Sequence, residues 1–111
     1  MTGITTHVLD TARGRPAADL PVALEIRSAD GWKVLGRART DPDGRASELF
    51  DGPIAAGAYR LTFDTASYFA AAGVETFFPV AQVVFEVRDP SSRYHVPLLL
   101  SPFGYSTYRG T

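Results

Sequence analysis

Residues 94–111 read YHVPLLLSPFGYSTYRGT, the densest run of aromatic, aliphatic and hydroxyl-bearing residues in the sequence. The pattern predicts two strands joined by a tight turn at Ser101-Pro102-Phe103-Gly104, because proline and glycine supply the backbone conformations that a tight turn needs. We expect this closing pair of strands to be held in the fold rather than frayed, with Thr111 and its carboxylate at a defined place. The stretch is therefore a candidate part of a functional site.

Upstream of this stretch, apolar residues alternate with period two between turn formers, which is the pattern of β-strands. Strands are predicted over residues 5–11, 22–27, 32–40, 45–50, 59–63 and 81–88. Turns are predicted at Gly14-Arg15-Pro16, Asp30-Gly31, Asp41-Pro42-Asp43-Gly44 and Asp89-Pro90-Ser91-Ser92. Only residues 65–73 break the period and predict a helix of about two turns, begun by Asp64 or Thr65 and stopped by Gly73. Eight short strands with one short helix predict an all-β fold, a sandwich of two sheets.

The length and composition exclude several classes of protein. The 111 residues predict a single domain spanning residues 1–111, and the absence of cysteine excludes disulfides and thiolate metal sites. The 11 basic and 12 acidic residues are scattered, so we expect no nucleic-acid partner and place most of the acidic residues on solvated faces and turns. No apolar run approaches the roughly 18 residues of a membrane span, and no signal peptide is visible, so we expect a cytoplasmic protein without a membrane partner.

The side chains that could carry chemistry are few: the two histidines, His7 and His95, and Arg45 directly after an Asp-Gly turn. Strand alternation places His7 opposite Val8 and His95 opposite Val96, so both imidazoles should face outward if the branched residues fill the core. Each of the three alone is more often an ordinary surface residue. Two imidazoles on strands that could pair make a shared site a stronger hypothesis.

Other catalytic templates are missing from the sequence. There is no glycine-rich phosphate loop, no G-x-S-x-G elbow and no zinc-binding helix motif, and no pair of carboxylates stands out as an acid and base. Pro97 lacks the backbone donor of a ladder position, which predicts a bulge or an edge strand there. The chain therefore has no predicted metal site, and its chemistry depends on His7, Arg45 and His95.

Four segments carry a resemblance to a known family: THVLD at 6–10, DGR at 43–45, YRLTFD at 59–64 and residues 94–110 of the closing stretch. Together they resemble the transthyretin-related 5-hydroxyisourate hydrolases over nearly the whole chain. The closing stretch discriminates best, because hormone-carrying transthyretins lack both the histidine matched by His95 and the tetrapeptide Tyr-Arg-Gly-Ser. Residues 108–111 read YRGT, so Thr111 stands where the family has serine.

The resemblance implies a transthyretin-like (prealbumin-like) sandwich of two four-stranded sheets, assembled as a homotetramer, a dimer of dimers with active regions in a central channel. It implies that His7, Arg45 and His95 are catalytic and also contact the substrate. The implied reaction is the cofactor-free hydrolysis of 5-hydroxyisourate to 2-oxo-4-hydroxy-4-carboxy-5-ureidoimidazoline, by water attack at C6 and cleavage of the N1–C6 bond. The further substrate-binding positions are Pro97, Ser106, Tyr108 and Thr111.

Several alternatives stay open at this point. Either histidine could take the proton from water while the other orients water or substrate, and Arg45 could hold the substrate oxygens through its planar fork. A transthyretin-like carrier of a small aromatic ligand is the first rival, although the two imidazoles and the guanidinium suit a polar, anionic purine derivative better. A purely structural sandwich is the second.

Overall fold

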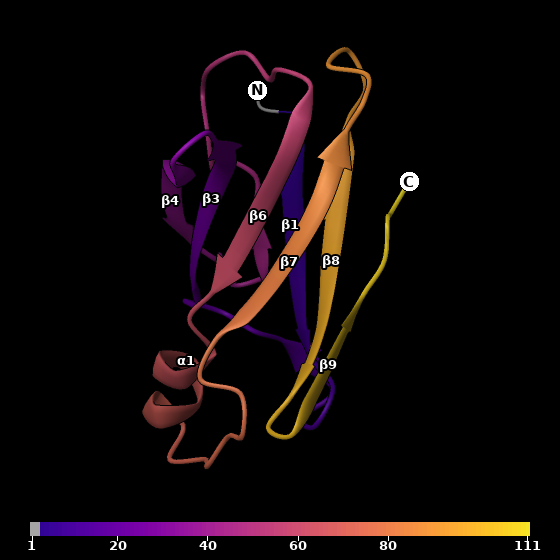
Figure 1. Ribbon diagram of the computed structural model, residues 1–111. Coiled ribbons are helices and arrows are strands. Elements are labelled where there is room, and N and C mark those ends of the chain that lie inside the picture. The colour runs from indigo at the N-terminus through magenta and orange to yellow at the C-terminus, as the bar shows by residue number, and fades with distance from the viewer. Residues whose placement is uncertain (1–2) are drawn as a thin grey trace.

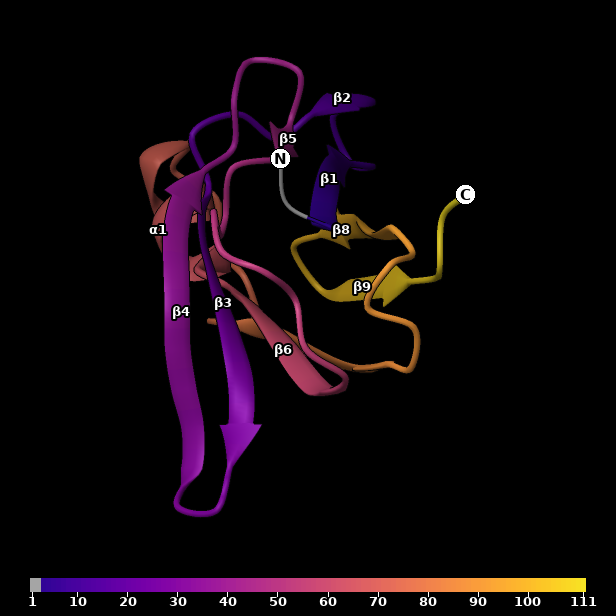
Figure 2. The ribbon, with the colours of Figure 1, turned by 90° about the horizontal axis from the view of Figure 1, so that it is seen from above.

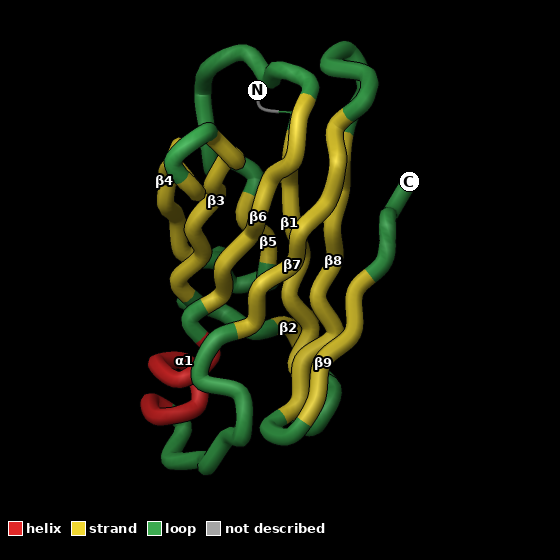
Figure 3. Tube along the Cα trace, in the orientation of Figure 1, coloured by secondary structure: helices red, strands yellow, loops and turns green. Residues whose placement is uncertain are grey.

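The computed structural model describes residues 3–111, and this part of the chain contains nine strands and one helix (Figure 1; Figure 3). The elements are β1 (Ile4–Asp10), β2 (Arg15–Pro16), β3 (Pro21–Ser28), β4 (Gly31–Arg39), β5 (Arg45–Ala46), β6 (Gly57–Phe63), α1 (Thr65–Ala71), β7 (Ala81–Val87), β8 (Tyr94–Ser101) and β9 (Gly104–Thr107). No helix in the described part of the chain is long and apolar enough to cross a membrane.

The strands form two sheets that face each other as separate layers, which Figure 2 shows from above. One sheet has the order β2-β1-β8-β9, with β5 also paired to β1, and the other has the order β4-β3-β6-β7. The predicted all-β sandwich is therefore confirmed. In the first sheet β1 and β8 run parallel, from the pair Ile4↔Tyr94 to the pair Asp10↔Leu100, although about 90 residues separate them in sequence.

The core lies between the two sheets and follows from the alternation of the strands. Along β1, every second residue from Ile4 to Asp10 is buried, and the residues between them are partly exposed. The largest fully buried side chains come from both sheets and from the helix, among them Tyr59, Phe63 and Phe69. Each such side chain contributes on the order of 2 kcal/mol by leaving water, so the inward faces fix which faces of the strands point outward.

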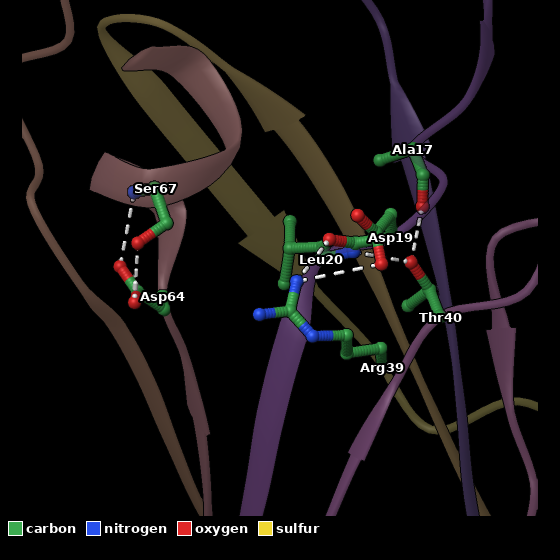
Figure 4. A network of polar contacts seen from close by, with 7 residues as sticks. All are labelled: Ala17, Asp19, Leu20, Arg39, Thr40, Asp64 and Ser67. Carbon is green, nitrogen blue, oxygen red and sulfur yellow. Dashed lines mark hydrogen bonds and ion pairs between the residues drawn. The ribbon is translucent and has the colours of Figure 1, made fainter. Parts of the chain in front are cut away.

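The helix α1 has the boundaries that its sequence predicts. Asp64 caps it by accepting hydrogen bonds from the backbone N–H and the hydroxyl of Ser67 (Figure 4). At the other end Gly73 has a φ of 69°, and the N–H groups of Gly73 and Val74 donate to the carbonyls of Ala70 and Phe69. Those two bonds make the left-handed glycine cap that ends many helices. The helix thus closes the end of the sandwich between β6 and β7 (Figure 1).

Two strand predictions differ from the structure. The strand predicted over residues 45–50 is limited to Arg45–Ala46, and Arg15–Pro16, predicted as a turn, forms the ninth strand, β2. Both two-residue strands pair with the same edge of β1, so this sheet has five strands rather than four. Each of these strands is only two residues long, and two residues are too few to show the alternation from which strands are predicted.

Two acidic residues, Asp10 and Glu25, are buried and so depart from the expectation that most acidic residues are solvated. Asp10 is 1% exposed and accepts the hydroxyl of Tyr68 and two backbone N–H groups. Glu25 accepts two bonds from Arg60 and one from the Thr62 hydroxyl, and the bond from Arg60 is the main cause that lowers the pKa of Glu25. Both carboxylates are tolerated because their oxygens have partners.

Candidate functional site

The outward face of the β1–β8 sheet brings the three predicted catalytic residues together. His7 on β1 lies directly opposite Arg45 on β5 and, on its other side, opposite Pro97 on β8. The next row joins Thr5 on β1 to His95 on β8. Residues opposite each other on neighbouring strands project to the same face of a sheet. Two adjacent rows therefore place His7, Arg45 and His95 on one surface, as strand alternation predicts for the histidines.

The turn before β5 sets the positions of Arg45 and His7. Gly44 has a φ of 79°, and a Cβ at this residue would lie 2.4 Å from the carbonyl oxygen of Val8, so only glycine lets the turn approach β1 this closely. The Oδ1 of Asp41 accepts the N–H groups of Asp43 and Arg45. The predicted Asp-Pro-Asp-Gly turn therefore delivers Arg45 to the edge of β1.

His7 is fixed by the same turn. Its Nε2 lies 2.8 Å from the carbonyl oxygen of Asp43. A carbonyl oxygen only accepts, so the Nε2 of His7 carries a proton and donates it to Asp43. The remaining ring nitrogen, Nδ1, is the one that His7 can offer to another molecule.

His95 is held on two sides. Its Nδ1 lies 2.8 Å from the Oγ1 of Thr5, and its carbonyl accepts the N–H of Gly110 at 2.7 Å. Gly110 lies so near the ring that a Cβ there would be 2.7 Å from the Cδ2 of His95. Burial lowers the pKa of His95 below its ordinary value, and electrostatic interactions with Arg45 and with His7 lower it further. The imidazole of His95 is thus a neutral base near neutral pH.

A pocket of about 660 Å³ lies beside His95. It is lined by Arg45, His95 and Thr111, all predicted site residues, and also by Arg93, Arg109 and Glu48. Neither Arg93 nor Arg109 is among the predicted site residues. Arg93 is a single arginine next to β8 and carries no motif, whereas Arg109 belongs to the YRGT segment, which was the signal that could have identified it. Arg109 packs its guanidinium over the ring of Tyr94 at 4.5 Å. With three guanidinium groups and only one acidic side chain in its lining, the pocket is suited to an anionic or oxygen-rich ligand.

Pro97 is neither at an edge strand nor exposed. It lies buried on β8, which is flanked by β1 and β9. Its carbonyl accepts the hydroxyl of Thr107, and the pairing of β8 with β9 stops at Leu98↔Thr107 and returns only at the bridge His95↔Gly110. The proline nitrogen faces the same neighbour as its carbonyl and has nothing to donate, so the chain after Thr107 leaves the ladder at this point.

Four predicted substrate-binding residues do not line the pocket of His95: His7, Pro97, Ser106 and Tyr108. His7 and Pro97 lie opposite each other in the neighbouring row of the same sheet face. Ser106 pairs with Leu99 on the outward face and is exposed. Tyr108 is exposed and lines a smaller pocket with Val84 of β7. The structure of this single chain therefore joins Arg45 and Thr111 to the pocket of His95 and places His7, Pro97, Ser106 and Tyr108 outside its lining.

The chemistry available at this site is proton transfer and charge stabilisation. A neutral imidazole can take a proton, and the guanidinium of Arg45 can hold a developing negative charge. Within residues 3–111, no group of three or more histidine, aspartate or glutamate side chains is arranged to hold a metal ion. The candidate catalytic groups are thus the side chains of His7, Arg45 and His95.

Comparisons with known proteins show the family to which the chain is similar. Residues 4–110 match the model of the HIUase/Transthyretin family. The 5-hydroxyisourate hydrolase of Salmonella dublin is 44% identical over 109 residues, which cover 97% of this chain and 80% of that protein. The structure of Klebsiella pneumoniae 5-hydroxyisourate hydrolase superposes with a TM-score of 0.87 at 37% identity, over 97% of this chain and 98% of that one. The sea bream transthyretin in complex with thyroxine superposes with a TM-score of 0.90 at 34% identity, over 98% and 95%. The chain belongs to the HIUase/Transthyretin family.

Proposed function

We propose that this chain is a hydrolase that opens the ring of 5-hydroxyisourate in urate degradation. The observation that carries the proposal is the convergence of His7, Arg45 and His95 on one sheet face, beside an arginine-lined pocket. The 5-hydroxyisourate hydrolases of Salmonella dublin and Klebsiella pneumoniae support the choice of substrate. No cofactor is invoked, because a positioned base and a cation suffice to open an activated cyclic amide.

His95 is the general base of the proposed reaction. Its low pKa keeps the ring neutral, so its Nε2 takes a proton from water while the water oxygen bonds to C6 of the substrate. The oxyanion then collapses, the N1–C6 bond breaks with its electron pair going to N1, and the imidazolium returns the proton to N1. The new carboxylic acid releases its own proton to solvent. The product is 2-oxo-4-hydroxy-4-carboxy-5-ureidoimidazoline.

The other groups bind and orient. The Nε2 of His7 is committed to the carbonyl of Asp43, so His7 orients water or substrate through Nδ1. Arg45 holds the oxyanion that forms at C6, which a planar guanidinium can do through two hydrogen bonds. Thr111 contacts the substrate from the pocket wall, and Pro97 keeps the surface beside His7 rigid. Ser106 and Tyr108 contact the substrate from the periphery.

We also propose that the chain works as a homotetramer, a dimer of dimers. The support is the position of the candidate groups on the outward face of a sheet, where a facing subunit would shield them from bulk water. A shielded site strengthens the electrostatic interactions of Arg45 and His95 with the reacting atoms. The same shielding would bring Ser106 and Tyr108 closer to the substrate.

A kinetic experiment tests the hydrolase directly. 5-Hydroxyisourate is generated with urate oxidase, and its absorbance is followed with and without the protein. We expect wild type to accelerate the decay, and His7→Ala, Arg45→Ala and His95→Ala to lose roughly a hundredfold or more of kcat/KM. Arg39→Ala is the matched control for Arg45→Ala, because Arg39 is an exposed arginine of the other sheet. Decay no faster than the spontaneous rate would sink the proposal.

A second candidate is a carrier of a small aromatic ligand without catalysis. The observation that favours it is the superposition on the thyroxine-bound sea bream transthyretin. Calorimetric titration with thyroxine separates the two: micromolar or tighter binding by a protein that does not accelerate 5-hydroxyisourate decay would favour the carrier. The imidazoles and arginines of the pocket favour the hydrolase.

A further inference from the structure

The hydroxyl of Thr5 is the only side-chain group of the described residues that forms a hydrogen bond with the imidazole of His95. The contact joins two residues that lie opposite each other on the parallel strands β1 and β8, and its length is 2.8 Å. Gly110 packs against the carbon edge of the same ring. The ring therefore has one nitrogen committed to β1 and one carbon edge closed by the C-terminal segment.

The second ring nitrogen, Nε2, faces solvent. No hydrogen bond from residues 3–111 reaches it, and no buried side-chain nitrogen or oxygen in this part of the chain lacks a partner. A buried Nε2 without a partner would be an unsatisfied buried atom, so the unbonded Nε2 of His95 must be accessible to water. Since His95 lines the pocket, Nε2 is the nitrogen available to a ligand there.

A neutral imidazole carries one proton, so the partner of Nδ1 decides which nitrogen has the free lone pair. If Thr5 accepts a hydrogen bond from Nδ1–H, the lone pair lies on Nε2, where a water molecule can be deprotonated. If Thr5 donates to Nδ1 instead, Nε2 carries the proton and cannot act as a base. A free histidine side chain prefers the proton on Nε2, so a productive His95 needs a partner that favours the other form.

We propose that Thr5 is a positioning residue that accepts the Nδ1 proton of His95 and so turns the lone pair of Nε2 to the pocket. The tautomer of His95 does not depend on which substrate the protein takes. The effect of Thr5 on the reaction rate rests on the proposed hydrolase function. Thr5 also lines the pocket, but its hydroxyl is bonded to Nδ1 of His95, so we assign its effect to the orientation of the imidazole.

A hydroxyl suits this position better than a carboxylate. A carboxylate next to Nδ1 would also fix the tautomer, but its negative charge would favour the imidazolium and raise the pKa of the ring. Thr5 is neutral, so it orients the ring without opposing the effects that keep it unprotonated. The charged groups around the ring are His7 on β1, Arg45 on β5, and Glu48, Arg93 and Arg109 at the pocket wall.

The test combines a spectroscopic and a kinetic readout on three variants. Thr5→Val removes the hydroxyl at nearly the same volume, and Thr5→Ser restores it. Thr11→Val is the matched control, because Thr11 directly follows β1 and its hydroxyl also bonds to β8, at the Leu100 carbonyl 3.1 Å away, but at the far end of β8 from His95. The protein has only two histidines, so the ¹⁵N signals of both rings can be assigned.

We expect the Nδ1–H form of His95 in wild type, Thr5→Ser and Thr11→Val, and a shift to the Nε2–H form in Thr5→Val. In the decay assay, Thr5→Val should lower kcat about tenfold with little change in KM, the scale of one neutral hydrogen bond. An Nε2–H form in wild type, or the same tautomer in wild type and Thr5→Val, would overturn the proposal. If wild type shows the expected tautomer but no hydrolysis, the hydrolase proposal fails while the role of Thr5 in fixing the ring stands.

Discussion

At the scale of single residues, the site depends on keeping one imidazole unprotonated among positive charges. Burial is the largest cause that lowers the pKa of His95, and Arg45 is the second. Lowering the pKa of a histidine favours its neutral form, so the base remains available at a pH below the usual histidine value of about 6.5. Arg45 thus serves the proposed reaction twice, by holding the oxyanion and by keeping the imidazole of His95 unprotonated.

The variant Arg45→Gln tests the second of these effects without any substrate. Removing the guanidinium charge should raise the pKa of His95 toward its ordinary value, although burial still holds it below that value. The measurement is an NMR titration of the His95 ring protons. Arg39→Gln, on the other sheet, should leave the titration unchanged. A pKa of His95 that stays constant or falls in Arg45→Gln would mean that the two groups do not interact.

Gly110 provides a second test at this scale. In Gly110→Ala the added Cβ would lie 2.7 Å from the Cδ2 of His95, so the ring has to move. We expect kcat for 5-hydroxyisourate to fall about tenfold or more, because a base displaced by a fraction of an ångström loses its alignment. Gly104→Ala is the control, because its Cβ would meet nothing nearer than the Ser101 hydroxyl at 3.8 Å. Equal activity in the two variants would contradict the tight packing of Gly110 on the ring.

At the scale of elements, the turn from Asp41 to Gly44 both stabilises the fold and positions Arg45 in the site. Gly44→Ala places a Cβ 2.4 Å from the Val8 carbonyl and forces a residue with a side chain to a φ of 79°. Gly14→Ala is a matched control, because Gly14 has a φ of 69° but nothing within 4 Å of the added Cβ. We expect Gly14→Ala to lower the free energy of unfolding by about 1 kcal/mol and Gly44→Ala by several. Urea unfolding measures both, and equal losses would show that the close approach to β1 is unimportant.

The elements also show what the sequence can and cannot predict. The alternation around His7 and His95 correctly predicts their outward faces, and the Asp-Pro-Asp-Gly pattern correctly predicts the turn before Arg45. The sequence does not predict a role for Thr5, because its partner, His95, lies 90 residues away. Periodicity predicts which face of each strand is buried, but it does not predict that β1 pairs with a strand about 90 residues away, so the row that joins Thr5 to His95 could not be predicted. The sequence also did not predict that Pro97 lies in a strand with neighbours on both sides. This position is possible because the chain beyond Thr107 leaves β8 at the point where the proline nitrogen cannot donate a hydrogen bond.

At the scale of the whole molecule, large apolar side chains gather where the loop after α1 meets the turn between β8 and β9. The N–H of Phe77 donates to the Pro102 carbonyl, and the rings of Phe78 and Tyr105 pack edge to face. Phe77 and Phe103 remain 70% and 67% exposed in the single chain. Neighbouring exposed aromatic residues are typical of a surface that another protein molecule covers.

The proposed homotetramer accounts for this surface and makes it testable. Burying two phenylalanine side chains in each subunit contributes several kcal/mol to association. Sedimentation velocity of wild type should therefore show four times the 12.0 kDa subunit mass, and Phe77→Ser combined with Phe103→Ser should shift it to smaller species. Val34→Ser, an exposed apolar residue of β4 on the other sheet, is the control and should leave the assembly intact. A double variant that stays tetrameric would place the subunit contacts elsewhere, and a monomeric wild type with full hydrolytic rate would show that a single sheet face suffices for the reaction.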